Sequence, residues 1–280
     1  KKNGGTNGEI KDLKKRIAAL ESGKEESENP EAEIAACKEQ LEAAKKKLFK
    51  PIFGCEMYVA RRRLEDKEGN QSGYHLVVLA KNLKGYHNLI KLVSKAWTKG
   101  FYMRPRTDRA ELEKYHEGLI VCSACLGGEV PRRITAGQFE EAEEAIRWYK
   151  NLFGDDYYLE LQRHKATVAR ANHEVYPMQQ VVNEKLIEYA KKYNIKLVCT
   201  NDVHFVDEEN AEAHDRLICL STGKDLDDPN RMLYTKQEWM KTREEMNEVF
   251  ADVPEALSNT VEICDKVEFY SIDHAPIMPT

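Results

Sequence analysis

Two polar residues that follow a short apolar run near residue 200 have the spacing of a metal-binding pair. Residues 195–199 predict a buried strand, and Asp202 and His204 come shortly after it. Residues two apart in a strand point to the same side and lie roughly 6.6 Å apart along the backbone. The carboxylate and the imidazole could therefore share one divalent cation. An aspartate after a strand is also a common turn former or helix cap, and this alternative stays open for the pair taken alone.

Three further donors lie in or directly after apolar segments that predict strands. Glu56 lies inside PIFGCEMYVA, His75 lies near the start of YHLVVLA, and Cys125 follows GLIVCSA. A carboxylate inside an apolar strand is costly unless it is paired or binds a metal. A thiolate just beyond a strand is a good zinc ligand. Each residue also has an ordinary interpretation: an outward-facing glutamate, a hydrogen-bonded core histidine, or a cysteine that serves as a small hydrophobe.

The joint placement of these donors is more specific than any one of them. All of them are nitrogen, oxygen or sulfur ligands suited to zinc-like or manganese-like ions. Polar groups of a site collect at the carboxyl ends of strands in parallel α/β sheets and barrels. We therefore expect one pocket at that edge, with a metal-ligand set of Glu56, His75, Cys125, Asp202 and His204.

The segments that position these donors alternate between strand and helix patterns from Pro51 onward, which predicts one large α/β domain. Asn82 should cap one helix, and further helices are expected at about 138–153 and 173–193. The last of these returns the chain to the strand that precedes Asp202.

Other polar residues near the predicted strands and helices have two interpretations. Glu160 and His164 follow a strand in DYYLELQRH, either as site groups or as surface polar residues. The stretches 235–238 and 242–245 both have the capping-box pattern, and each is expected to open a short helix.

Residues 1–49 have a different pattern from the rest of the chain. Apolar residues recur at spacings of three and four over residues 9–21 and 30–48, with lysine and glutamate elsewhere. This predicts an antiparallel helical hairpin, an insertion that projects from the body, with partner docking or plain solvation as its role. Residues 50–267 would be the domain body, and the proline-rich residues 268–280 a linker.

Composition limits the possible classes of protein. The 280 residues are 41% hydrophobic and 32% charged, with a net charge of −5, so there is no global attraction to nucleic acid. Seven scattered cysteines indicate a reducing compartment, and we expect a cytoplasmic protein. No membrane span or signal peptide is predicted. The chain begins with Lys1 rather than Met, and we interpret it as a piece of a longer protein.

Several motifs together resemble a known family over roughly residues 50–280. The motifs are FGCEMYV, YHLVVLAKN, GYHNLIKLVS, ACLGGEVP, YYLELQRH, CTNDVHF and DRLICLSTGK. They resemble the PHP (polymerase and histidinol phosphatase) domain at the start of the alpha subunit of bacterial DNA polymerase III, a C-family replicative polymerase. The resemblance implies a distorted seven-stranded, TIM-like α/β barrel with a metal cluster at its carboxyl-end mouth. Family ligands fall on Glu56, His75, Cys125, Asp202 and His204.

The resemblance also implies that part of the site is missing. The family begins with a His-x-His strand, an Asp and an Asp-His strand end, whereas residues 1–49 contain no histidine. The chain therefore resembles a fragment that starts after the first two barrel strands and ends before the polymerase palm. Divalent zinc, manganese or magnesium would be incompletely bound, and the fragment should not polymerise DNA.

For the intact protein the resemblance implies DNA replication, DNA-directed nucleotidyl transfer and metal-dependent phosphoester hydrolysis of the 3′ to 5′ exonuclease type. DNA and other polymerase III holoenzyme subunits would be its partners. A non-catalytic structural and docking module is the alternative. A free-standing phosphatase for small phosphate esters is a third, which the polymerase-type motifs disfavour. No catalytic residue can be named from the sequence.

Overall fold

The computed structural model describes residues 4–25, 27–47, 49–67 and 73–278. The chain divides into two compact units, Lys1–Pro51 and Ile52–Thr280. Within the described residues, no helix combines the length and the apolar character that crossing a membrane requires.

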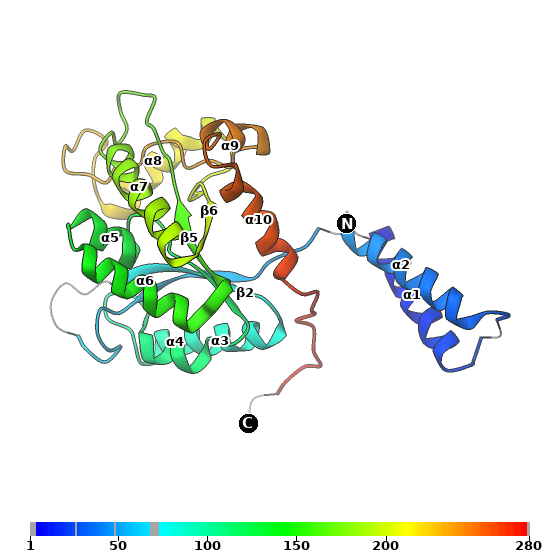
Figure 1. The fold of residues 1–280 in the computed structure, drawn as a ribbon. Coiled ribbons are helices and arrows are strands. Elements are labelled where there is room, and N and C mark those ends of the chain that lie inside the picture. The colour runs from blue at the N-terminus through cyan, green and yellow to red at the C-terminus, as the bar shows by residue number, and fades with distance from the viewer. Residues whose placement is uncertain (1–3, 26, 48, 68–72, 279–280) are drawn as a thin grey trace. The chain divides into compact units, whose positions relative to one another are not determined.

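The N-terminal unit contains helices α1 (Gly4–Glu21) and α2 (Pro30–Lys46) (Figure 1). The two helices pack on each other through the apolar residues of both stripes, with Ile17, Cys37 and Leu41 buried between them. Asn29 caps α2 by accepting a hydrogen bond from the Ala32 N–H, as the sequence pattern predicted. That this unit projects from the body as an insertion stays a prediction.

The body is organised on one six-stranded sheet. Its order is β3-β1-β2-β4-β5-β6. The strands are β1 (Gly54–Val59), β2 (Tyr74–Ala80), β3 (Arg106–Thr107), β4 (Leu119–Cys122), β5 (Tyr157–Leu161) and β6 (Lys196–Cys199). β4, β5 and β6 pair in parallel, whereas β2 runs antiparallel to both of its neighbours, β1 and β4. The predicted α/β class is confirmed, and a seven-stranded closed barrel remains a prediction.

Helices connect and cover the strands (Figure 1). They are α3 (Leu83–Thr98), α4 (Arg109–Tyr115), α5 (Glu129–Thr135), α6 (Phe139–Phe153), α7 (Val175–Tyr193), α8 (Ala211–Thr222), α9 (Arg243–Val249) and α10 (Pro254–Lys266). Short 3₁₀ turns lie at Gly154–Asp156 and Glu208–Asn210. The long amphipathic helices begin and end close to the predicted residues, because cap residues such as Asn82 and Gly154 mark their ends.

The pleat of the strands divides the apolar side chains between two faces. Alternate residues such as Leu76, Val78 and Leu159 belong to the large core, which the apolar stripes of α3, α6 and α7 complete. The intervening residues, including Ile120 and Val198, pack on the other face in a smaller cluster with residues of α10. Because side chains alternate between the two faces along a strand, every second residue of β1 and β2 points away from the large core.

Two segments differ from the sequence-based expectations. Thr242 caps α9 in a full capping box, but no helix follows Thr235, where the Glu238 side chain accepts hydrogen bonds from the Thr235 backbone and hydroxyl within an irregular segment. The start of the predicted linker is attached to the body. The Glu268 N–H donates to the Lys81 carbonyl (2.8 Å) and the Tyr270 hydroxyl to the Ala80 carbonyl (3.2 Å).

One prediction concerns the contact between α3 and the turn before β4. Gly85→Ala should destabilise the protein by about 1–3 kcal/mol, because the added Cβ would lie 1.8 Å from the Gly118 carbonyl oxygen. Urea unfolding measures the change. Ser94→Ala, at an exposed position of the same helix, is the control and should be neutral or slightly stabilising. Equal stability of the two variants would contradict the close packing of α3 on this turn.

Candidate metal centre

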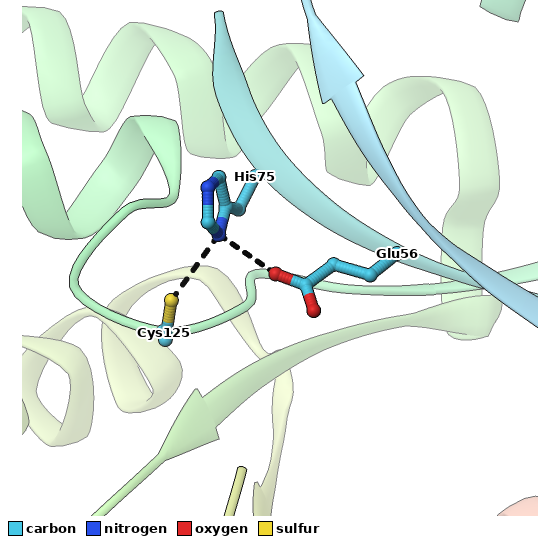
Figure 2. Close-up of side chains that lie close together, drawn as sticks. All are labelled: Glu56, His75 and Cys125. Carbon is cyan, nitrogen blue, oxygen red and sulfur yellow. Dashed lines mark hydrogen bonds and ion pairs between the residues drawn. The ribbon is translucent and has the colours of Figure 1, made fainter. Parts of the chain in front are cut away.

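Three of the five predicted ligands form a compact group (Figure 2). One ligand atom from each of Glu56, His75 and Cys125 lies within 4.8 Å of the other two. His75 Nδ1 is 2.7 Å from Glu56 Oε1 and 3.5 Å from Cys125 Sγ, so the imidazole nitrogen lies between the carboxylate and the thiol. A carboxylate oxygen, an imidazole nitrogen and a thiol sulfur facing one another are a mixed ligand set of the kind that zinc accepts.

The strand pairing explains how Glu56 and His75 meet. β1 and β2 pair antiparallel with Tyr58 opposite His75 and Glu56 opposite Val77. Glu56 and His75 are therefore diagonal neighbours on one face, the side opposite the large core. We predicted that the ligands collect at carboxyl ends of strands, and for His75 this is wrong, because it lies at the amino end of β2. Because β2 runs antiparallel to β4, the amino end of β2 lies beside the carboxyl end of β4, and Cys125 follows that end of β4.

The loop after β4 wraps closely around His75. The His75 N–H donates to the Gly127 carbonyl (3.0 Å), and the Gly127 N–H donates to the Cys125 sulfur (3.4 Å). A Cβ on Gly127 would lie 3.0 Å from the His75 ring. The loop starts at Ala124, whose φ of 64° is unusual for a residue with a side chain. Such local strain is typical of functional loops and fixes the direction of the next side chain, here Cys125.

The electrostatics of Cys125 disfavour a free thiolate. Burial and the nearby Asp202 carboxylate raise the pKa of this thiol to about 12, while the hydrogen bond from Gly127 acts in the opposite direction. The thiol is therefore protonated at neutral pH and must lose its proton to bind a metal. Metal affinity at such a site rises with pH.

Asp202 and His204 form a second pair beside this group. His204 Nε2 lies 3.7 Å from Asp202 Oδ1. Asp202 and Cys125 both line one cavity of about 200 Å³. The pair is outside the compact three-residue group. Asp202 has a φ of 44°, so this strand end, like that at Ala124, departs from the ordinary backbone conformations.

The two members of this pair shift each other's pKa in opposite directions. Burial by itself would raise the pKa of Asp202, but His204, with His164 and His75, lowers it below its ordinary value. The ion pair with Asp202 raises the pKa of His204 above its ordinary value, against burial. The stabilising contribution of Asp202 is thus lost as pH falls through its lowered pKa. That of His204 is lost as pH rises through its raised pKa.

Comparisons with known proteins identify the family of this chain. A model of the PHP domain matches residues 28–164. The chain belongs to the PHP domain family. DNA polymerase III subunit alpha of Borreliella burgdorferi is 45% identical over 242 residues, which cover 84% of this chain and 20% of that protein. The Thermus aquaticus protein with the same description is 39% identical over 227 residues, 77% of this chain and 18% of that protein. The chain spans about a fifth of the length of these relatives.

Two polar residues of the PHP domain hold the ends of the strands in place. Glu160 is buried within β5 rather than after it, and its carboxylate accepts hydrogen bonds from the Ala124 N–H and the Thr200 hydroxyl. His164 is buried as well, with Nδ1 accepting from Gln179 and Nε2 directed at the Asn201 carbonyl. Neither is a surface residue. Glu160 supports the Cys125 loop and His164 the Asp202 loop.

Sequence reasoning missed Glu238 as a site residue. The sequence pattern predicts a helix cap at Glu238, yet its buried side chain lines the same cavity as Cys125 and Asp202. One feature of the sequence could have indicated this role. The capping-box pattern at residues 235–238 is not followed by the periodic apolar residues of an amphipathic helix, so the pattern does not mark the start of a helix.

The donors of the PHP domain fit a divalent metal ion. Ligands of one zinc ion are each about 2.0–2.3 Å from it and hence at most about 4.5 Å apart. The separation of up to 4.8 Å between the donor atoms of Glu56, His75 and Cys125 requires only a small closing movement. A metal would replace the close contact between His75 Nδ1 and Glu56 Oε1 by bonds to both atoms.

The ion pair gives a prediction for the metal-free protein. In Asp202→Asn the pKa of His204 should fall toward the ordinary histidine value of about 6.5, because the carboxylate that favours the imidazolium is gone. An NMR pH titration of the His204 ring protons in a chelating buffer measures it. Glu209→Gln, at an exposed position in the following turn, is the control and should leave the titration unchanged. An unchanged His204 titration in Asp202→Asn would contradict the ion pair.

Proposed function

We propose that this chain is the PHP domain of a bacterial replicative DNA polymerase and that the intact protein uses it for metal-dependent phosphoester hydrolysis, of the 3′ to 5′ exonuclease type. The observation that carries this proposal is the convergence of Glu56, His75 and Cys125 from separate segments within a PHP domain. The similarity to DNA polymerase III alpha subunits supports the role in replication, with DNA and the other holoenzyme subunits as partners.

The chain's own residues would have distinct tasks in this reaction. A divalent ion, when bound, activates water and neutralises charge on a phosphate oxygen. Glu56, His75 and Cys125 would hold it, with Cys125 giving up its proton on binding. Asp202, which lines the same cavity as Cys125, and its ion-pair partner His204 would complete the ligand set. Buried Glu160 and His164 would keep the two donor loops from moving as charge changes in the site.

The proposal includes an incomplete site in the chain as it stands. We propose that the six-stranded sheet is part of a seven-stranded barrel that lacks its first strands, with α1 and α2 as a projecting hairpin. An ion held by part of its ligands has lower affinity and fixes its water poorly. The alternative, a non-catalytic structural and docking module, predicts that metal has no effect on nucleic acid cleavage even in the intact protein.

Metal binding can be tested on this chain directly. Zinc titration should show binding that tightens as pH rises, and Cys125→Ser should weaken it at least about 10-fold, because loss of a ligand costs no less than loss of an outer-sphere partner. Cys55→Ser is the matched control, since Cys55 is next to Glu56 on β1 but points to the other face of the sheet. Equal zinc affinity of the two variants would rule out Cys125 as a ligand.

Activity is the test of the proposed function itself. With manganese or zinc, the intact polymerase should shorten an end-labelled single-stranded oligonucleotide from its 3′ end, and Asp202→Ala in the same protein should abolish this. The isolated chain should show no appreciable cleavage, because its ligand set is incomplete. Robust cleavage by the isolated chain that Asp202→Ala removes would show that the described ligands suffice. No metal-dependent cleavage by the intact protein would favour the docking module.

A further inference from the structure

Glu238 is held rigidly by only one of its two carboxylate oxygens. Oε1 accepts hydrogen bonds from the Thr235 N–H (3.0 Å) and the Thr235 hydroxyl (2.6 Å). The side chain is 3% exposed, and neighbouring Lys236 has a φ of 65°, which turns the chain sharply within this segment. Two hydrogen bonds to one oxygen fix the plane of the carboxylate, so the direction of Oε2 is fixed as well.

Hydrogen bonds from the His204 backbone and the Asn201 side chain fix the segment around Glu238 against the segment that carries Asp202 and His204. The His204 N–H donates to the Glu238 carbonyl (2.8 Å). The Asn201 amide donates to the carbonyls on either side, those of Gln237 (2.8 Å) and Trp239 (2.7 Å). These bonds flank Asp202 on both sides, so Glu238 and the Asp202–His204 pair form one rigid unit.

The second oxygen of Glu238 has no assigned role within the fold. Oε2 is buried and has no hydrogen-bond partner among the described residues. Glu238 lines the cavity of about 200 Å³ that Asp202 and Cys125 also line. Leaving a buried polar atom unpaired costs about 1–3 kcal/mol, and more for a charged group. A native structure normally avoids this cost unless a ligand uses the atom.

We propose that Glu238 is an additional metal-binding residue, with Oε2 as a donor to a divalent cation held together with Asp202 and His204. This inference rests on the proposed function, because it assumes that the cavity binds metal. Two carboxylates on one small cavity repel each other, and a cation between them removes the repulsion. Lys241 acts on Glu238 only through its charge, because its ammonium donates to the Gln237 carbonyl (2.6 Å) and Oε2 has no hydrogen-bond partner among the described residues.

A cation explains the site better than a hydroxyl of a bound nucleotide. A hydroxyl would satisfy Oε2 but would leave the Asp202 carboxylate balanced only by neighbouring histidines, of which His204 forms an ion pair with it at 3.7 Å. Carboxylate and imidazole ligands together suit manganese and zinc. The rigid hold on Oε1 matches the outer hydrogen bonding that orients metal-ligating carboxylates in proteins.

Glu238→Gln is the test, because glutamine keeps an Oε1 acceptor for Thr235 and replaces only the free oxygen. Manganese binding is measured by electron paramagnetic resonance and calorimetry on the chain, and thermal unfolding is followed with and without manganese. Glu209→Gln, an exposed carboxylate in the same half of the domain, is the charge-matched control. We expect at least about 10-fold weaker manganese binding in Glu238→Gln and no change in the control.

Thermal unfolding distinguishes a ligand from a structural residue. Without metal, Glu238→Gln should be no less stable than the parent chain, because it replaces an unpaired buried carboxylate oxygen by an uncharged amide nitrogen, whose burial costs less than that of a charged group. With manganese, the parent chain should gain more stability than the variant, because binding to the folded state alone raises stability. A variant that is destabilised equally with and without metal would show a purely structural role and would overturn the proposal.

The remaining outcomes separate this proposal from the proposed function. Normal manganese binding by Glu238→Gln, with zinc binding still sensitive to Cys125→Ser, would overturn the role of Glu238 and leave the metal site intact. Absence of any metal binding by the parent chain would overturn both. If Glu238→Gln does not fold, Glu238→Asp keeps the charge but withdraws it by one methylene group. It should also weaken manganese binding, and unchanged binding in it would contradict the proposal.

Discussion

The direction of β2 is the constraint on which the candidate metal centre depends. β2 runs against both of its neighbours in the sheet, so its amino end, with His75, lies beside the carboxyl end of β4. The hairpin register then places Glu56 diagonally from His75, on the face away from the large core. If β2 ran parallel to β4, His75 would lie beside the amino end of β4, whereas Cys125 follows its carboxyl end. The three donors could then not meet.

The loops that carry the other donors are held in uncommon backbone conformations by buried polar groups. Ala124 and Asp202 both have positive φ angles. The buried Glu160 carboxylate binds the Ala124 N–H, and buried His164 contacts the Asn201 carbonyl. Each strained residue would cost on the order of 1–3 kcal/mol, and it persists only where surrounding contacts determine it. Contacts with buried residues of the domain thus stabilise two loop conformations that would be unfavourable by themselves.

Burial and neighbouring charges shift the pKa values of Cys125 and Asp202 in opposite directions. Burial raises the pKa of Cys125, and Asp202 reinforces this, so the thiol keeps its proton. Burial by itself would raise the pKa of Asp202, and the neighbouring His204 lowers it below its ordinary value. A divalent ion would reverse this balance for the thiol, because metal binding favours the deprotonated ligand. The site and its metal would therefore be coupled to pH.

The sequence by itself determined the class of fold and the main helices, and it predicted the candidate donors. Capping residues and apolar periodicity are local signals, so α3, α6 and α7 begin and end near the predicted residues. Strand pairing is not local, and nothing near His75 specifies that β2 reverses or that Tyr58 lies opposite it. The sequence predicted all five ligands as one set. Only the tertiary structure separated the compact group of Glu56, His75 and Cys125 from the neighbouring Asp202–His204 pair.

Glu238 is a second residue whose role depends on contacts between distant segments of the chain. Its sequence context is that of a helix cap, and its side chain does accept the capping hydrogen bonds from Thr235. Whether a helix follows and where the second oxygen points depend on Asn201 and His204, more than 30 residues earlier in the chain. Local sequence determines which hydrogen bonds a side chain can make. Contacts between distant segments determine which of its atoms remain for a ligand, because only the folded chain decides what is buried beside them.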